Sequence, residues 1–126
     1  MTVELDHCIV PSRDAPRAAK LLGDLLDVRW SERATIGPFS PVFVNDGLTL
    51  DFQTTDEAFP IHHYCFRVTQ DQLDAILGRL RSAGIPFRSD VAGSNDNKVG
   101  EKYGNVYWNE PDGHYWEVLT VSYART

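Results

Sequence analysis

The chain has 126 residues, of which 42% are hydrophobic, and a formal net charge of −6 at neutral pH. This length and composition suit one compact domain, and the acidic balance disfavours a nucleic-acid partner, which requires a basic patch. No apolar run approaches the roughly 20 residues that span a bilayer, and the N-terminus lacks the pattern of a secretory signal. We therefore expect a cytoplasmic protein with no membrane partner.

The first half of the chain reads as a strand, a helix and three further strands. The strand LDHCIV carries His7. The helix begins after a capping Asp14 and a first-turn Pro16, and apolar residues recur through it at helical spacing. Three short strands follow, separated by Gly-Pro and Asn-Asp-Gly turns, at residues 29–32, 41–45 and 48–53.

The second half repeats this order. A strand at 61–68 carries two adjacent histidines, and the next helix opens with a capping box between Thr69 and Gln72 and ends near Gly84. Three more strands are predicted at 86–88, 105–109 and 114–121. The sequence thus predicts an α+β fold of two tandem βαβββ modules, residues 1–57 and 58–126, within a single domain spanning residues 1–126.

The repeat is plainest where each half ends. Asp46 begins DGLTLDF, and Asp112 begins DGHYWEV, so each half has a turn followed by a strand that carries one acid. These acids are Asp51 and Glu117. Since each half also has a histidine on its first strand, His7 and His63, two related halves would bring two imidazoles and two carboxylates around one axis. This arrangement predicts a metal site.

Strand alternation identifies the side chains that would face this site. The inward sets that contain the two carboxylates leave the large apolar residues on the opposite faces, toward the helices. Two histidines with one or two carboxylates suit Zn²⁺, Ni²⁺, Co²⁺, Mn²⁺ or Fe²⁺, and a set of two histidines and one carboxylate leaves coordination positions open for a substrate. The remaining inward polar residues are candidates for substrate binding: Thr49, Gln53, Arg67 and Tyr115.

Structural roles remain open for several of these residues. Asp51 is either a ligand, direct or through water, or a polar residue in a wet cavity, and Arg67 either pairs with an acid such as Asp51 or binds an anionic substrate. His62 faces away from His63 unless the strand register slips by one residue. His114 is expected to point outward in a structural or surface role. The polar stretch at 89–104 is either a lid or a plain surface loop.

The motifs LDHCIV, HHYCFRV and YWNEPDGHYWEV resemble the vicinal oxygen chelate superfamily, which includes glyoxalase I, extradiol dioxygenases, fosfomycin-inactivating enzymes and bleomycin-binding proteins. The resemblance covers essentially the whole chain. It implies paired βαβββ modules that form an open, cupped barrel around a divalent metal. It also implies that His7, His63 and Glu117 are metal ligands, that Asp51 occupies the place of the fourth ligand of glyoxalase I, and that the protein is a homodimer.

The resemblance favours a metal-dependent lyase or isomerase of glyoxalase type. Its small substrate would chelate the metal through adjacent oxygens, and Glu117 or Asp51 would move a proton. An extradiol dioxygenase is an alternative, although residues 89–106 contain no histidine to match the extra catalytic one of that branch. Ile9 stands where fosfomycin enzymes have threonine. A metal-free binding protein of bleomycin-resistance type is a further alternative, although such a binder need not keep all three ligands.

Overall fold

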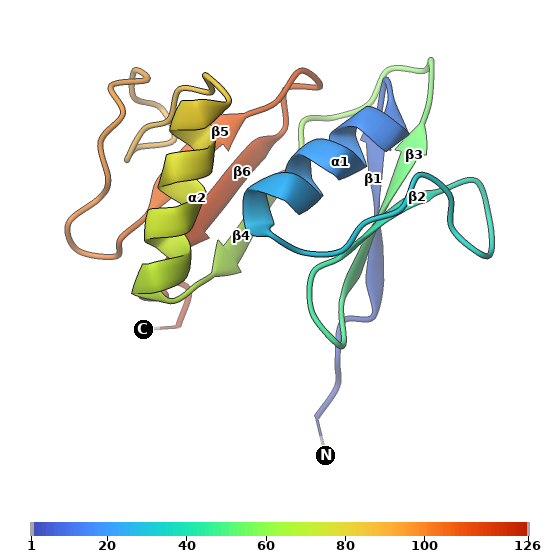
Figure 1. Cartoon of the computed structure of the whole chain (residues 1–126), viewed down its shortest axis with the longest axis horizontal. Coiled ribbons are helices and arrows are strands. Elements are labelled where there is room, and N and C mark those ends of the chain that lie inside the picture. Colours follow the sequence, from blue (N-terminus) through green and yellow to red (C-terminus); the bar gives the residue numbers. More distant parts are fainter. Residues whose placement is uncertain (1, 126) are drawn as a thin grey trace. The chain divides into compact units, whose positions relative to one another are not determined.

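Two three-stranded sheets, each with its own helix, make up the computed structural model, which describes residues 2–125. The chain divides into two units between Pro60 and Ile61 (Figure 1). The first unit contains β1 (His7–Ser12), α1 (Ala15–Leu26), β2 (Ser40–Phe43) and β3 (Thr49–Thr54). The second contains β4 (His63–Arg67), α2 (Gln70–Ser82), β5 (Val106–Asn109) and β6 (Tyr115–Leu119).

Both units have the same sheet topology, as the sequence repeat predicts. The strand orders are β1-β3-β2 and β4-β6-β5, so the last strand of each unit lies in the centre of its sheet. The central strand β3 pairs in parallel with β1 and antiparallel with β2. In the same way, β6 pairs in parallel with β4 and antiparallel with β5. The acids of the repeat, Asp51 and Glu117, therefore both lie on central strands.

One expected strand in each unit is shorter than the sequence suggests. In place of strands at 29–32 and 86–88, the structure has isolated bridges, Trp30 to Val42 and Arg88 to Tyr107. Pro86 contributes no backbone N–H, and Trp30 is followed by polar residues that lead into a loop, so neither segment sustains a ladder of hydrogen bonds. The βαβββ order holds, with a single bridge as the first strand after each helix.

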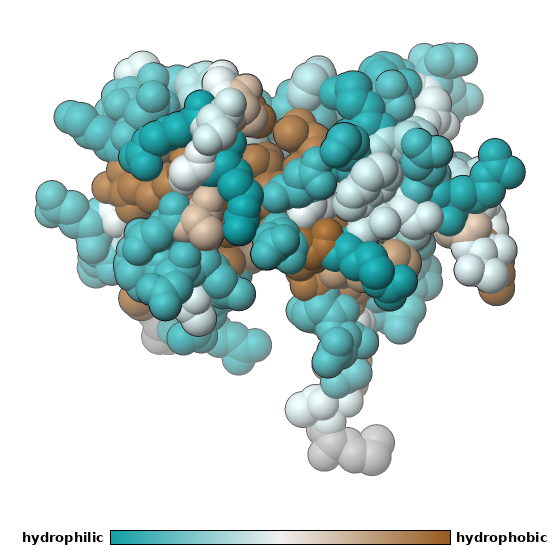
Figure 2. Space-filling model, viewed as in Figure 1, coloured by the Kyte–Doolittle hydropathy of each residue, from teal (hydrophilic) through white to brown (hydrophobic). Residues whose placement is uncertain are grey.

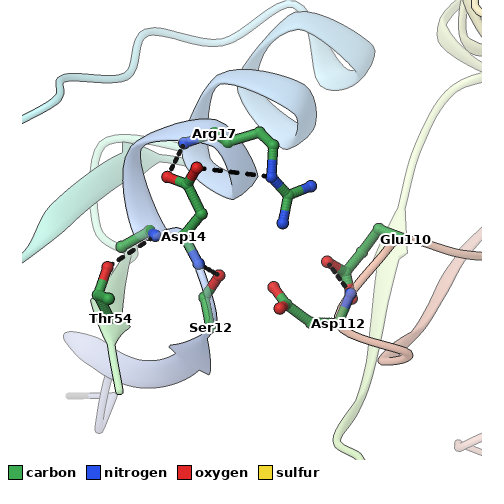
Figure 3. A network of polar contacts seen from close by, with 7 residues as sticks. Ser12, Asp14, Arg17, Thr54, Glu110 and Asp112 are labelled. Carbon is green, nitrogen blue, oxygen red and sulfur yellow. Dashed lines mark hydrogen bonds and ion pairs between the residues drawn. The ribbon is translucent and has the colours of Figure 1, made fainter. Parts of the chain in front are cut away.

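Side-chain caps fix where the helices begin. The Asp14 carboxylate accepts a hydrogen bond from the Arg17 backbone N–H at 3.2 Å, and the Thr54 hydroxyl accepts one from the Ala15 N–H at 2.9 Å, which ties the start of α1 to the end of β3 (Figure 3). In α2, Thr69 and Gln72 form the predicted capping box.

Each sheet has large, buried apolar side chains on the face turned away from its acid. Leu50 and Phe52 of β3 are 1% exposed, and Trp116 and Val118 of β6 are 1% and 0% exposed. In the first unit, α1 packs on the sheet. Hydrophilic residues cover most of the visible side of α2 (Figure 2). The apolar faces thus hold each unit together and leave His7, Asp51, His63 and Glu117 on the other face of their sheets.

Within residues 2–125, no helix has the length and apolar character needed to cross a membrane.

Candidate metal centre

The second unit brings a histidine and a carboxyl group together. The β4 and β6 strands are parallel, with His63 opposite Tyr115 and Cys65 opposite Glu117, so the side chains of these four residues share a face. His63 Nε2 lies 3.2 Å from Glu117 Oε1. The His63 side chain is 46% exposed, whereas that of Glu117 is 0% exposed. The pair therefore has a buried carboxyl group with an accessible imidazole beside it.

One oxygen of Glu117 is well satisfied and the other is not. Oε1 accepts a hydrogen bond of 2.6 Å from the Tyr123 hydroxyl. Burial and the neighbouring Glu117 raise the pKa of that hydroxyl, which keeps it protonated as the donor. Oε2 is buried and has no hydrogen-bond partner within residues 2–125. A buried carboxyl oxygen without a partner carries a large desolvation cost, which a bound cation would offset.

The other nitrogen of His63 is held by the backbone. Nδ1 lies 3.1 Å from the Tyr115 carbonyl oxygen, and because a carbonyl only accepts, Nδ1 must donate. In a neutral imidazole this leaves the Nε2 lone pair facing Glu117. Metal-binding histidines commonly have their second nitrogen fixed in this way. The Tyr107 ring stacks on the imidazole, with centroids 5.9 Å apart.

These features fit a divalent cation. Ligand nitrogen and oxygen atoms lie about 2.0–2.2 Å from such a metal, so two ligands of one ion are typically about 3 Å apart. The 3.2 Å between His63 Nε2 and Glu117 Oε1 has that size. A cation bound beside Glu117 Oε2 would also stabilise this buried oxygen, which has no hydrogen-bond partner within residues 2–125.

The first unit brings His7 and Asp51 to one face. In the register of β1 and β3, His7 lies opposite Thr49 and Ile9 opposite Asp51. His7 Nδ1 donates a hydrogen bond of 2.8 Å to the Asp6 carboxylate, which raises the pKa of His7, and the charge of Asp51 adds to the effect. Burial raises the pKa of Asp51, while His7 lowers it. The sequence did not predict this contact between Asp6 and His7, because strand alternation places adjacent residues on opposite faces.

No group of three or more His, Cys, Asp or Glu side chains within residues 2–125 is arranged to hold a metal ion. Each unit by itself contributes one histidine and one acid. The three-ligand set of His7, His63 and Glu117 therefore stays a prediction.

The predicted substrate-binding residues lie on the same faces as these pairs. Thr49 and Gln53 flank Asp51 on β3, and Tyr115 flanks Glu117 on β6. Arg67 lies at the exposed end of β4, on the face of His63. Their roles in binding stay predictions.

Sequence reasoning missed Arg88. This residue is 5% exposed, and its guanidinium lies 5.8 Å from the centroid of the Tyr115 ring. It also donates hydrogen bonds to Val91 O and Asn95 Oδ1. A lone arginine at the end of a short apolar segment carries no sequence signal for burial, because arginine is usually exposed.

Cys65 lies beside Glu117 but is unsuited to nucleophilic chemistry. Burial, together with the charge of Glu117 and a contact with it, raises the pKa of the thiol to about 12. The thiolate, which is the reactive form, is therefore scarce near neutral pH.

The two other histidines of this unit have structural contacts. His62 Nδ1 lies 2.8 Å from the Tyr64 hydroxyl, and the His62 backbone N–H donates to His114 Nδ1 at 2.9 Å. His114 is 0% exposed. Its side chain points away from the face of Glu117, as expected, but it is packed inside the unit and does not reach solvent. A surface role for His114 is thus wrong, and a structural one is consistent with its contacts.

The turn before β6 is organised by Glu110. Its two oxygens accept hydrogen bonds from the backbone N–H groups of Asp112 and His114 (Figure 3 shows the bond to Asp112). Burial raises the pKa of Glu110 to about 7. Gly113, at φ 90°, completes the turn in a conformation that disfavours other residues.

The polar stretch at 89–104 is attached to the unit at several points. Asn97 exchanges two hydrogen bonds with the Phe87 backbone, and the Asn105 side chain donates to Ser89 O. The bonds from Arg88 add to these anchors. These hydrogen bonds attach the loop to the second unit, and a role as a lid stays a prediction.

No protein-family model and no curated protein sequence matches the chain. Solved structures do. Oxidase ChaP-H2 is 35% identical over 98% of this chain and 97% of its own, with a TM-score of 0.89. Oxidase ChaP-H1 is 34% identical over 97% and 98%, with a TM-score of 0.87. Both relatives have the vicinal oxygen chelate fold.

The chain belongs to the vicinal oxygen chelate superfamily. This membership confirms the α+β class and the paired modules that the sequence predicts. The fold is shared with the fosfomycin resistance protein FosX from Listeria monocytogenes, a structure complexed with Mn(II) and sulfate, at 14% identity over 98% and 94% of the two chains and a TM-score of 0.70. The relatives above 30% identity are enzymes by name, which places this chain on an enzyme branch of the superfamily.

Proposed function

We propose that the chain is a divalent-metal-dependent oxidase. His7, His63 and Glu117 hold the ion, and the two units act as one domain, residues 1–126. The observation that carries the proposal is the buried Glu117 carboxyl group, whose Oε2 has no hydrogen-bond partner while His63 Nε2 lies 3.2 Å from Oε1. The ion is one of Zn²⁺, Ni²⁺, Co²⁺, Mn²⁺ or Fe²⁺, and oxidase chemistry favours a redox-active member of this group.

The proposed substrate is a small molecule with two neighbouring oxygens. His7, His63 and Glu117 would hold the ion, and an ion held by two histidines and one carboxylate would supply Lewis-acid or redox chemistry to such a substrate. Oxidation is the reaction class named for the two ChaP relatives, which are 35% and 34% identical to this chain. This identity over nearly full length is the reason for placing oxidation before isomerisation.

The residues of the chain have distinct tasks in this proposal. Glu117 and His63 fix the ion on the second unit, and the Tyr115 carbonyl keeps His63 Nε2 available. The substrate is contacted by polar side chains on the same sheet faces as the metal ligands: Arg67, Tyr115, Thr49 and Gln53. A homodimer, common among superfamily members, is part of the same proposal.

A glyoxalase-like lyase or isomerase is the second candidate, and Asp51 favours it. Burial raises the pKa of this carboxyl group, and Asp51 shares a strand face with His7. A general base works best when its pKa lies near the working pH. As a base, Asp51 would move a proton of a chelated substrate without any oxidant.

Oxygen uptake separates the two candidates. Metal-free protein is loaded anaerobically with Fe²⁺ or Mn²⁺ and mixed in air-saturated buffer with a panel of catechols, hydroquinones and α-hydroxyketones. The proposal expects oxygen consumption with at least one member and none with the Glu117→Ala variant. Conversion of a substrate without oxygen consumption would support the isomerase instead and contradict the oxidase.

A further inference from the structure

The segment after β6 brings a tyrosine back to the acid of that strand. The Tyr123 hydroxyl donates to Glu117 Oε1 over 2.6 Å, a short bond for a phenol and a carboxyl group. Glu117 is fully buried, whereas Tyr123 is 36% exposed. The tyrosine therefore lies between the buried acid and the surface of the unit.

The segment that carries Tyr123 is anchored to Tyr103. The Tyr103 carbonyl accepts hydrogen bonds from the backbone N–H groups of Thr120 and Val121, at 2.9 and 3.1 Å, and from the Thr120 hydroxyl at 3.1 Å. The rings of Tyr103 and Tyr123 pack edge to face, with centroids 5.3 Å apart. These contacts limit the positions open to the Tyr123 ring, so its hydroxyl is preorganised.

Gly104 permits this anchoring. Its φ of 61° disfavours other residues, and a Cβ on Gly104 would collide with the Thr120 side chain. The loop can approach the end of β6 closely only because this position is glycine.

A second tyrosine fixes the direction of the hydrogen bonds. The hydroxyls of Tyr107 and Tyr123 lie 3.2 Å apart. The Tyr123 hydroxyl has a single hydrogen, which it donates in the hydrogen bond to the Glu117 carboxyl group. The Tyr107 hydroxyl is therefore the donor in the hydrogen bond between the two tyrosines. The relay runs from Tyr107 to Tyr123 to Glu117, and Tyr107 also stacks on His63.

We propose that Tyr123 is a positioning residue for the metal ligand Glu117. Its hydroxyl fixes the orientation of the Glu117 carboxyl group through the hydrogen bond to Oε1. Within residues 2–125, Oε2 has no hydrogen-bond partner. The inference rests on the proposed function, because it takes Glu117 to be a metal ligand. Residues that hydrogen-bond to ligands typically contribute 10–100-fold to metal affinity.

The test is metal affinity of the full chain in the absence of substrate. Metal-free wild type and Tyr123→Phe are titrated with Zn²⁺ and with Co²⁺ against a chelating dye. The variant keeps the packing ring and loses only the hydroxyl. Tyr103→Phe is the matched control, because it removes a hydroxyl from the other ring of the same edge-to-face pair.

We expect Tyr123→Phe to raise Kd about 10-fold or more at unchanged stoichiometry and to alter the visible absorption of bound Co²⁺. Tyr103→Phe should change Kd less than about 2-fold. A purely structural role for Tyr123 would lower the melting temperature of Tyr123→Phe without changing its Kd or its Co²⁺ spectrum. Wild-type affinity and spectrum in Tyr123→Phe would overturn the inference.

Two further variants keep the test decisive. Thr120→Val removes one anchor and leaves Tyr123 in place, so it should weaken binding less but in the same direction, and it replaces Tyr123→Phe if that variant does not fold. Glu117→Gln should abolish tight binding. If Glu117→Gln binds normally, the metal centre itself is wrong and the inference falls with it; if only the tyrosine and threonine variants bind normally, the centre stands and the positioning role is wrong.

Discussion

The Nε2 atom of His63 lies 3.2 Å from Oε1 of Glu117, although one side chain is half-exposed and the other is fully buried. Parallel pairing of β4 with β6 produces this relationship, because it sets His63 at the start of β4 opposite Tyr115, and Glu117 lies two residues further along β6 on the same face. A fully buried acid with one oxygen, Oε2, left without a hydrogen-bond partner within residues 2–125 is costly to the fold. Its presence is best explained by a use in binding.

Glu117→Gln should stabilise the metal-free protein while removing metal binding. The amide has the same shape and still accepts a hydrogen bond from Tyr123, but it carries no charge to bury. We expect the melting temperature of the metal-free form to rise by roughly 3–6 °C, as about 1 kcal/mol produces in a small domain. Calorimetry of both proteins in excess chelator measures this. A lower melting temperature in the variant would show that the acid serves the fold.

His63 and His62 should separate metal binding from packing. Adjacent strand residues face opposite sides, and His62 contacts Tyr64 and His114 while His63 faces Glu117. His63→Ala should weaken metal binding ~10-fold or more. His62→Ala should keep the affinity and lower the melting temperature. Equal loss of metal from both variants, with folding intact by circular dichroism, would contradict this assignment.

Asp51→Asn tests the isomerase alternative. If Asp51 is a general base, the variant should retain most of the metal and lose turnover by on the order of 10²-fold or more. If the protein is an oxidase with three protein ligands, oxygen uptake should fall much less. Steady-state rates at fixed metal loading distinguish these results.

Glu110 should make stability depend on pH. Its pKa rises from 4.5 to about 7 in the folded state, so the folded protein holds this proton more tightly than the unfolded chain. The contribution to stability is complete below pH 4.5 and is lost as pH rises through about 7. Urea denaturation at pH 5 and pH 8 should show a smaller loss of stability in Glu110→Gln than in wild type. An equal loss in both would show that Glu110 does not cause it.

Local patterns predicted most of the fold. The caps at Asp14 and Thr69 and the period-two alternation of β3 and β6 depend on neighbouring residues, so the sequence displays them. The strands expected at 29–32 and 86–88 became single bridges, because their length depends on pairing with residues distant in the chain.

The sequence predicted only those site residues whose position follows from the alternation of side chains along a strand. The alternation and the repeat pointed to His63 and Glu117 on one face, and the register of β4 and β6 brings them together. Tyr123 and Arg88 reach this face from a loop and from a single bridge, and neither position has a period that could reveal it. Their contacts depend on how the segments around Tyr103 and Asn95 fold back.

The central claim is that one divalent ion binds through His7, His63 and Glu117. The most direct measurement is elemental analysis of protein purified without added metal, followed by reconstitution of the metal-free chain, for wild type and for the three single alanine variants and their triple combination. The account predicts about one ion per chain in wild type, a loss of affinity of ~10-fold or more in each single variant, and no ion in the triple variant. Unchanged metal content in the triple variant would contradict it.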